Sequence, residues 1–219
     1  SPFHPNVPQG GATVVNVDCE RYDGFEGAIE VKLLNLPTGY TATETTIEPG
    51  ETSARILISA AQNMAKRATN LCADSTVLVT KANIDGKERV KTLTSFVRTP
   101  LFTMLPNPDL SVTTDHQEAS IRPNGEVTIE VTVSRKGKYG KRVPVDVRNL
   151  PFGVRVIDVG LNGVLITEDE TKRKFTLYCE PWVKPQTRSI YVTGEVEGGV
   201  GNSAPPILLR VESTRTARN

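Results

Sequence analysis

Histidine and cysteine are the residue types of this chain best suited to catalysis or metal binding, and the chain has few of either. His4 lies among prolines and His116 in a polar turn, and neither accompanies a nucleophile in a motif such as Gly-x-Ser-x-Gly. The three cysteines form no Cys-x-x-Cys pair, which argues against a zinc site and a dense disulfide framework. The sequence therefore predicts no catalytic residue, no bound metal and no cofactor, and we expect the chain not to be an enzyme on its own.

A cluster of positive charge is the next candidate for chemistry, because it could hold an anion. Five cations and one aromatic residue fall between positions 135 and 142: Arg135, Lys136, Lys138, Tyr139, Lys141 and Arg142. This segment, the basic loop, has the composition of a site for an anionic glycan or an acidic protein. The alternative is a loop whose charges are simply solvated.

The single tryptophan, Trp182, lies in the segment Glu180-Pro-Trp-Val-Lys-Pro185. A partly exposed tryptophan can stack on a sugar or anchor an interface. The alternative is a ring that plugs the open end of the fold. An aromatic patch beside Arg135 and Lys138 would favour a binding site, and an end-plugging ring would favour a structural role.

Acidic residues gather in the first half of the chain where the second half has its basic loop: Asp18, Glu20, Asp23 and Glu26. Calcium takes carboxylate and carbonyl oxygens from such loops. The alternating aspartate spacing of a calcium loop is missing, however, and Arg21 lies among the acids. A solvated loop is therefore the favoured interpretation, with calcium as the alternative.

The overall composition excludes two classes of partner. Lys and Arg number 26 against 25 Asp and Glu, so the chain lacks the basic excess of a nucleic-acid binder. The longest apolar runs have the length of strands, so this segment contains no membrane span. The chain begins without an initiator Met or a signal-peptide core, as expected of a segment of a longer protein.

An internal repeat indicates the architecture that must position these residues. Asn35-Leu-Pro-Thr-Gly39 reappears 114 residues later as Asn149-Leu-Pro-Phe-Gly153. Apolar positions match in register on both sides of this block, including Val15 with Ile129 and Val31 with Val145. After an insertion of five residues, the two halves match again, as Ile56 with Phe175. The chain is a duplication.

The repeated blocks alternate apolar and polar residues with period two, which is typical of half-buried strands. Gly and Pro interrupt the pattern every 8 to 12 residues, the spacing of a sandwich or barrel. The sequence therefore predicts an all-β chain of two tandem immunoglobulin-like (Ig-like) β-sandwich domains, residues 1–98 and 99–219.

Three local expectations accompany this division. Leu101–Leu105 is too apolar for a solvated linker and is expected to pack at the junction or begin the second domain. A strand at 119–122 has no evident counterpart in the first half, so the first strand of the first domain is either residues 1–7 in irregular form or lies upstream. Cys19 and Cys179 fall on the same alternate positions as the apolar residues of their strands and are expected to face the core, whereas Cys72 lies in a polar stretch. Because a disulfide needs Cα atoms within about 7 Å and an Ig-like layout separates Cys19 from Cys72, three free thiols are predicted.

Three segments of the first half resemble a known family: Val17-Asp-Cys-Glu-Arg-Tyr-Asp-Gly-Phe-Glu-Gly-Ala-Ile-Glu-Val31, Asn35-Leu-Pro-Thr-Gly39 and Ile47-Glu-Pro-Gly-Glu-Thr52. They are similar to bacterial Ig-like repeats of large surface or secreted proteins of planctomycete-type bacteria, often found beside peptidase-associated domains. The second half keeps Arg135 and Tyr139 but lacks the Pro-Gly turn at Glu168-Asp169. The resemblance implies an extracellular or periplasmic spacer or adhesion-type module, with no catalytic residues to carry over.

The sequence thus leads to one principal hypothesis and one alternative. The principal hypothesis is a non-catalytic structural or interaction module of a larger exported protein, whose partners are the other domains of that protein. The alternative is a carbohydrate- or cell-surface-binding module that uses the basic loop and Trp182. Its ligand would be a protein or an anionic glycan.

Overall fold

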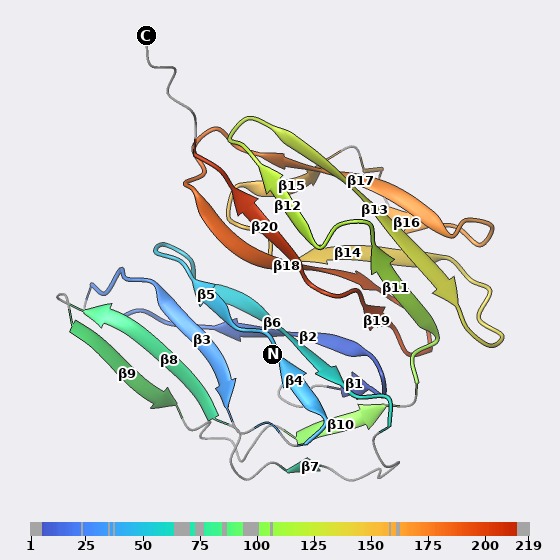
Figure 1. The fold of residues 1–219 in the computed structure, drawn as a ribbon, viewed down its shortest axis with the longest axis horizontal. Helices are drawn as coiled ribbons and strands as arrows, with labels where there is room; N and C mark the ends of the chain where they lie inside the picture. The colour runs from blue at the N-terminus through green and yellow to red at the C-terminus, as the bar shows by residue number, and fades with distance from the viewer. Residues whose placement is uncertain are drawn as a thin grey trace. The chain divides into compact units, whose positions relative to one another are not determined.

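The computed structural model describes residues 6–22, 24–34, 36, 38–63, 107–157, 159–160 and 163–213, and the backbone alone of 71–72, 77–84, 87–93 and 101–105. These residues form strands and turns, and none of them lies in a helix. The chain divides into two compact units, Ser1–Pro108 and Asp109–Asn219 (Figure 1).

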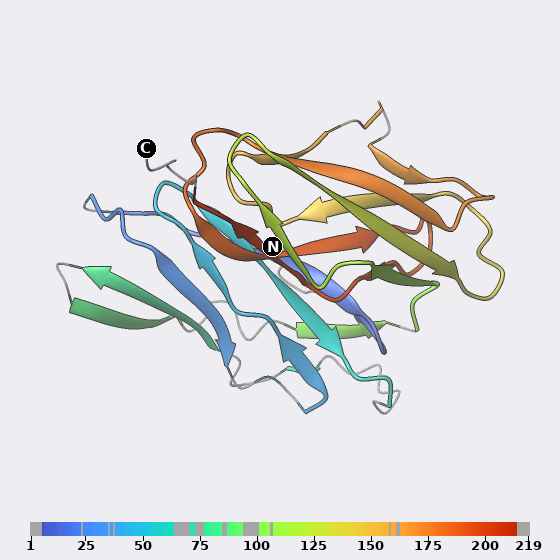
Figure 2. The same ribbon diagram turned by 45° about the horizontal axis from the view of Figure 1, so that its top comes forward.

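The second unit consists of two sheets. One has the order β11 (Leu110–Thr114), β13 (Glu126–Arg135), β17 (Lys172–Cys179) and β15 (Val154–Ile157). The other has the order β12 (Glu118–Ile121), β20 (Ile207–Val211), β18 (Gln186–Gly194), β14 (Val143–Arg148) and β16 (Val164–Ile166), and β19 (Asn202–Ser203) pairs with β18. Figure 2 shows the two layers, with the olive β13 and orange β17 in one and the yellow β14 in the other.

The core of the second unit lies between these sheets because each strand directs alternate residues inward. On β13, Ile129, Val131 and Val133 are buried while their neighbours are more exposed. They join one cluster with Phe175 from the same sheet and Ile190 from the facing sheet. Two antiparallel sheets over a shared core, with this division of strands between them, define an Ig-like β-sandwich.

The first unit repeats most of these strands, although none of its described strands corresponds to β11. One sheet has the order β2 (Ala12–Asp18), β6 (Ser53–Ala60) and β4 (Tyr40–Ala42). The second has the order β5 (Thr45–Ile47), β3 (Ile29–Leu34), β8 (Val77–Ile84) and β9 (Lys87–Leu93). A third, small sheet contains β1 (Asn6–Pro8), β10 (Leu101–Leu105) and β7 (Leu71–Cys72). The chain is therefore two tandem Ig-like β-sandwich domains.

The two units share their register and their turns. Val15 lies opposite Ile56 in the first unit, as Ile129 lies opposite Phe175 in the second. Three backbone hydrogen bonds of the first unit have equivalents in the second. In the first unit they join Cys19 N to Thr52 O, Ala60 N to Gly11 O and Ala61 N to Gly39 O. In the second unit the equivalents, in the same order, join Val133 N to Thr171 O, Cys179 N to Gly125 O and Glu180 N to Gly153 O. The turn that follows Leu-Pro ends in each case on a glycine with φ of 89°.

The segment Leu101–Leu105 belongs to the first unit, which ends at Pro108, ten residues beyond the division that the sequence predicted at 98/99. It forms β10, which pairs in parallel with β1 and antiparallel with β7. The second unit begins with β11 at Leu110. The apolar character of Leu101–Leu105 predicted that this segment packs at the junction or begins the second domain, but its membership of the first unit depends on pairing with β1, almost one hundred residues earlier in the chain.

The parallel pairing of β1 with β10 decides between the two alternatives for the first strand of the first domain, residues 1–7 or a strand further upstream, in favour of the former. In the second unit, β12 pairs in parallel with β20. The β1 strand is its counterpart, since Val7 and Ile121 are equivalent in the repeat and both are buried. Three residues are too few to show an alternating pattern, which is why the sequence left both alternatives open.

Candidate functional site

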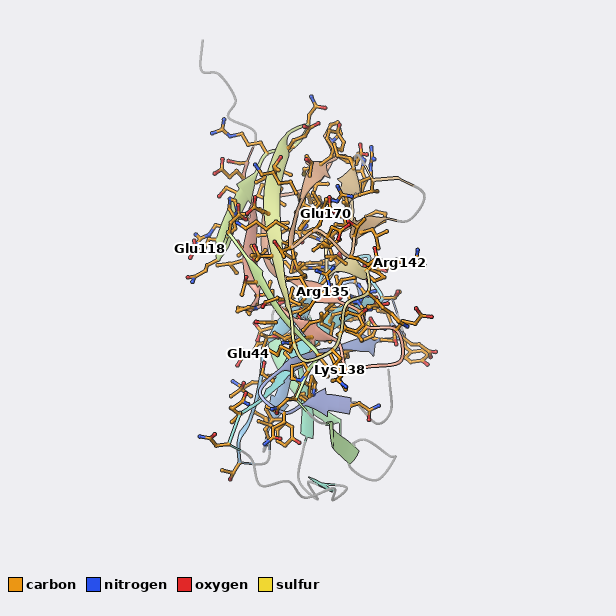
Figure 3. All side chains as sticks on the ribbon, turned by 90° about the vertical axis from the view of Figure 1, so that its right-hand side faces the viewer. Glu44, Glu118, Arg135, Lys138, Arg142 and Glu170 are labelled. Atoms are coloured by element: carbon orange, nitrogen blue, oxygen red, sulfur yellow. The ribbon has the colours of Figure 1, made fainter. Side chains whose placement is uncertain are left out.

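The basic loop connects β13 to β14 at one end of the second unit. It contains six of the seven residues predicted to bind a ligand, and Figure 3 labels three of them together with Glu170. The side chains of Lys136, Lys138, Lys141 and Arg142 are exposed, whereas Arg135 and Tyr139 are half-buried. The structure therefore separates these residues into two groups with different roles.

Arg135 directs its guanidinium group at backbone carbonyls of its own domain. Its Nε donates to Lys141 O at 3.0 Å, Nη1 to Glu170 O at 2.6 Å and Nη2 to Thr167 O at 2.6 Å. The Glu170 carboxylate accepts in turn from Thr167 N–H at 3.1 Å, and this bond holds the pKa of Glu170 below its usual value. Arg135 thus fastens the basic loop to the turn between β16 and β17, so we assign it a positioning role.

Arg21 occupies the equivalent position in the first unit and makes the same type of contact. Its guanidinium donates to Gly27 O at 2.5 Å, Glu48 O at 2.9 Å and Glu51 O at 3.2 Å. The shared arrangement, an arginine that fastens two loops through their carbonyls, is called here the arginine clamp. Sequence reasoning missed it, although one signal was present: Arg21 and Arg135 align in the repeat while the loops around them have opposite charge.

Two further residues of the basic loop are engaged within the domain. The Tyr139 hydroxyl donates to Arg142 O at 2.9 Å, and the ring packs against the core, so burial raises the pKa of this hydroxyl. Lys141 Nζ lies 3.8 Å from a carboxylate oxygen of Glu197. Lys136, Lys138 and Arg142 are the exposed cations that the structure leaves as candidates for an anionic ligand.

Trp182 lies at the opposite end of the second unit from the basic loop. Glu126, at the start of β13, pairs with Tyr178 near the end of β17, and Trp182 follows that strand. The ten residues of β13 span roughly 30 Å at about 3.3 Å per residue. Trp182 and the basic loop therefore do not form one site, contrary to the prediction that grouped them.

Trp182 does not plug the end of the sandwich either. Its side chain is 56% exposed and packs against Phe152, which is 72% exposed. The centroids of the two rings are 5.1 Å apart, with 51° between the ring planes. Val183, beside Trp182 in the chain, is the residue that enters the core.

The acidic loop of the first unit makes internal contacts of its own. Asp18 accepts a hydrogen bond from Asn16, and Glu20 accepts one from the Tyr22 hydroxyl, which raises the pKa of Tyr22. Within the described ranges, no three His, Cys, Asp or Glu side chains lie close enough together to hold a metal ion. Asp23, part of the predicted acidic cluster, lies outside the described residues.

The cysteines and histidines lie apart from these loops. Cys19 is half-buried and Cys179 fully buried, both as free thiols, and the side chain of Cys72 lies outside the described residues. His116 Nδ1 is 2.6 Å from Asp115 Oδ1 in the turn between β11 and β12. Partial burial by itself raises the pKa of Asp115, but hydrogen bonds from His116 and from Glu130 N–H outweigh it and lower that pKa. His4 lies outside the described residues.

No protein-family model and no curated protein matches this chain. Among solved structures, domains 4 and 5 of the S-layer protein SbsC share 15% identity with a TM-score of 0.32, over 62% of this chain and 65% of that one. The fibronectin(III)-like modules of Clostridium thermocellum CbhA share 12% identity with a TM-score of 0.31, over 99% and 93%. Domains 1–6 of SbsC share 12% identity with a TM-score of 0.30, over 83% and 20%.

The chain thus spans less than two thirds of either SbsC structure. Likeness at this level carries no information on function, and the assignment of the fold rests on the strand order and cores described above. In the part of the chain that the structure describes, no helix is long and apolar enough to cross a membrane.

Proposed function

We propose that this chain is a non-catalytic structural and interaction segment, a spacer or adhesion-type pair of modules, of a larger exported protein. The observation that carries the proposal is the arginine clamp, which occurs in both modules and connects the same two loops. A spacer needs a repeated unit whose loops hold their geometry. Donor groups directed at backbone carbonyls supply that rigidity from within each module.

The parent protein and its location belong to the same proposal. The resemblance to Ig-like repeats of planctomycete-type surface proteins supports an extracellular or periplasmic location, with the other domains of the parent as partners. Labelling of intact cells with a membrane-impermeant amine reagent tests this location, because Lys138 is exposed. Modification of Lys138 in intact cells supports an extracellular location, and modification once the outer membrane is permeabilised supports a periplasmic one. Modification only after complete lysis would contradict both.

A replacement of the whole segment tests the spacer function directly. An unrelated tandem pair of Ig-like domains of the same length replaces residues 1–219 in the parent protein, and the activity of the parent at the cell surface is measured. A spacer requires that this activity persist. Loss of activity, with normal folding and export, would contradict the spacer and favour a specific interaction of these modules.

The second candidate function is binding of an anionic glycan or acidic protein at the basic loop, supported by the exposure of Lys136, Lys138 and Arg142. The triple change of these residues to Ser tests it against a panel of acidic polysaccharides. Arg135 stays in place, because its removal would disturb the loop itself. Binding that weakens from low to physiological salt, where the Debye length falls to about 8 Å, and that disappears in the variant would support this site.

A further inference from the structure

Two large aromatic side chains lie exposed side by side at the Trp182 end of the second unit. Trp182 and Phe152 form a tilted pair, which we call the aromatic pair. The core is closed without these two rings, because Pro151, Val154 and Val183, which are near them in the chain, are the residues buried at this end. Exposed apolar surface that the core does not need is typical of a binding site.

The backbone beneath the aromatic pair is shaped to receive the tryptophan ring. Gly153 has φ of 89°, and a Cβ atom at this position would lie 2.6 Å from Trp182 Cη2 and 2.6 Å from Val183 Cγ2. The ring therefore rests closely against the main chain and is held before any ligand arrives. An aromatic surface held in this way binds with a smaller loss of conformational entropy.

The first unit shows that the fold does not require aromatic residues at these two positions. The repeat places Thr38 at the position of Phe152 and Asn63 at the position of Trp182, and both are exposed. Gly39 keeps the same φ of 89° as Gly153. The aromatic pair is thus a property of the second unit alone, added to a turn that forms without it.

Charged groups of both signs lie within three residues of the aromatic pair in the chain. Arg155 lies over the Tyr178 ring, 5.2 Å from its centroid, and its Nε is 3.2 Å from Glu180 Oε1. Glu180 is two residues from Trp182, and its N–H donates to Gly153 O at 2.9 Å. The end of the unit therefore combines an aromatic surface with a donor and an acceptor at its border.

This combination matches the chemistry of a sugar. A pyranose ring presents C–H groups on its faces and hydroxyl groups at its rim, and each hydroxyl both donates and accepts hydrogen bonds. The hydroxyl groups at the rim of the sugar can therefore accept a hydrogen bond from Arg155 and donate one to Glu180. A proline-rich peptide also stacks on aromatic residues, but its prolines have no N–H to donate to Glu180. A stable protein partner would need about 800 Å² per side, far more than two rings provide.

We propose that Phe152 and Trp182 form a stacking platform for a neutral polysaccharide, with Arg155 and Glu180 as its polar contacts. The opposite charges of Arg155 and Glu180 offset each other, so the site favours an uncharged glycan. This inference goes beyond the spacer function and is independent of the basic loop. Replacement of the whole segment tests the spacer, whereas the following experiment tests the platform alone.

The experiment uses the fluorescence of Trp182, the only tryptophan of the chain. The full chain is titrated with neutral oligosaccharides of glucose, N-acetylglucosamine, mannose and xylose. We expect a saturable shift of the emission to shorter wavelength for at least one of them, insensitive to salt. Phe152→Ala keeps the reporter and should weaken binding at least about tenfold. Tyr22→Ala, which removes a 68% exposed aromatic residue from the first unit, should leave binding unchanged.

Three outcomes would overturn the proposal. The first is the absence of a saturable response to every neutral glycan. The second is a response to a proline-rich peptide without one to glycans, which would assign the site to peptides. The third is an unchanged affinity for the oligosaccharide in Phe152→Ala, which would show that Phe152 is not part of the binding site. Because Phe152 is largely exposed, this variant should fold normally, and an unchanged circular dichroism spectrum and melting temperature verify this.

Discussion

Arg135 stabilises the second domain through three backbone carbonyls that belong to two different loops. A carbonyl that is partly removed from water depends on its remaining donors, and a charged donor contributes more than a neutral one. The fork of a guanidinium group can serve several acceptors at once, which a lysine ammonium cannot do at the same distances. The arginine clamp is therefore sensitive to substitutions that preserve charge.

We predict that Arg135→Ala lowers the free energy of unfolding of the second domain by about 2–3 kcal/mol, because it leaves the carbonyls of Thr167 and Glu170 without this donor. Arg135→Lys should recover only a minor part of the loss. Urea denaturation measures both. Lys138→Ala, in the same loop, is the matched control and should change stability by less than about 0.5 kcal/mol. Equal effects of Arg135→Ala and Lys138→Ala would show that the clamp does not stabilise the domain.

Cys179 gives a second prediction at the scale of single residues. Its side chain is 0% exposed, and burial, together with the nearby Glu180 charge, raises the pKa of its thiol. A thiol with a raised pKa stays protonated at neutral pH and reacts slowly. In the native protein, maleimide should therefore modify Cys19 before Cys179, and peptide mapping by mass spectrometry measures the order.

The same reagent counts the thiols. Unfolding without reductant should make all three cysteines reactive, because the sequence predicts no disulfide. Labelling of a single cysteine after unfolding would reveal a bridge. Labelling of Cys179 as fast as Cys19 in the native state would contradict its burial.

At the scale of elements, the turn between β14 and β15 joins the core to the aromatic pair. Asn149 begins it with φ of 63°, and its side chain donates to Ser189 O on β18 at 2.7 Å. Gly153 ends it in a conformation that residues with a Cβ atom rarely adopt. The turn thus anchors the sheet at one end and supports Trp182 at the other.

We predict that Gly153→Ala destabilises the second domain by about 2–4 kcal/mol, because the new Cβ adds a clash with Trp182 and Val183 to the strain of a positive φ. Gly137→Ala is the control, since Gly137 has φ of 63° but open space around its Cβ position. Gly137→Ala should lower the free energy of unfolding by about 1–2 kcal/mol, because it adds the strain of a positive φ without a clash. Urea denaturation compares the two variants, and Trp182 emission should change only in Gly153→Ala. Equal losses would show that the ring does not rest on Gly153.

At the scale of the whole molecule, the extent of the first domain depends on one pairing. The β10 strand covers β1 in parallel register, from Asn6 opposite Thr103 to Pro8 opposite Leu105. A division after residue 98 removes this strand from the domain and leaves the backbone groups of β1 without their partner. We therefore propose a boundary at 108/109 for separating the domains.

We predict that the fragment 1–108 is more stable than 1–98, because only the longer fragment retains β10. The fragment 109–219 should fold as well as 99–219, since the strand within the ten additional residues, Leu101–Leu105, pairs with strands of the first unit. Midpoints of urea denaturation measure all four. Equal stability of 1–98 and 1–108 would show that β10 does not support the first domain.

The sequence by itself determined the class of fold and its duplication. Alternation of apolar residues is a local consequence of the pleated strand, so the parity of Val15 and Ile129 could be read without a structure. The repeat then showed that both halves have the same register. The Leu-Pro-x-Gly turns and the core parity of Cys179 followed from the same local rules.

Only the tertiary structure decided which residues of the candidate sites lie together. Arg135 was predicted to bind a ligand, but its acceptors at Thr167 and Glu170 are more than thirty residues away in the chain. Trp182 was grouped with the basic loop, and strand direction placed it at the other end. Hydrogen-bond partners and strand pairings depend on how distant segments meet in the closed sandwich, and residue type and spacing do not contain that information.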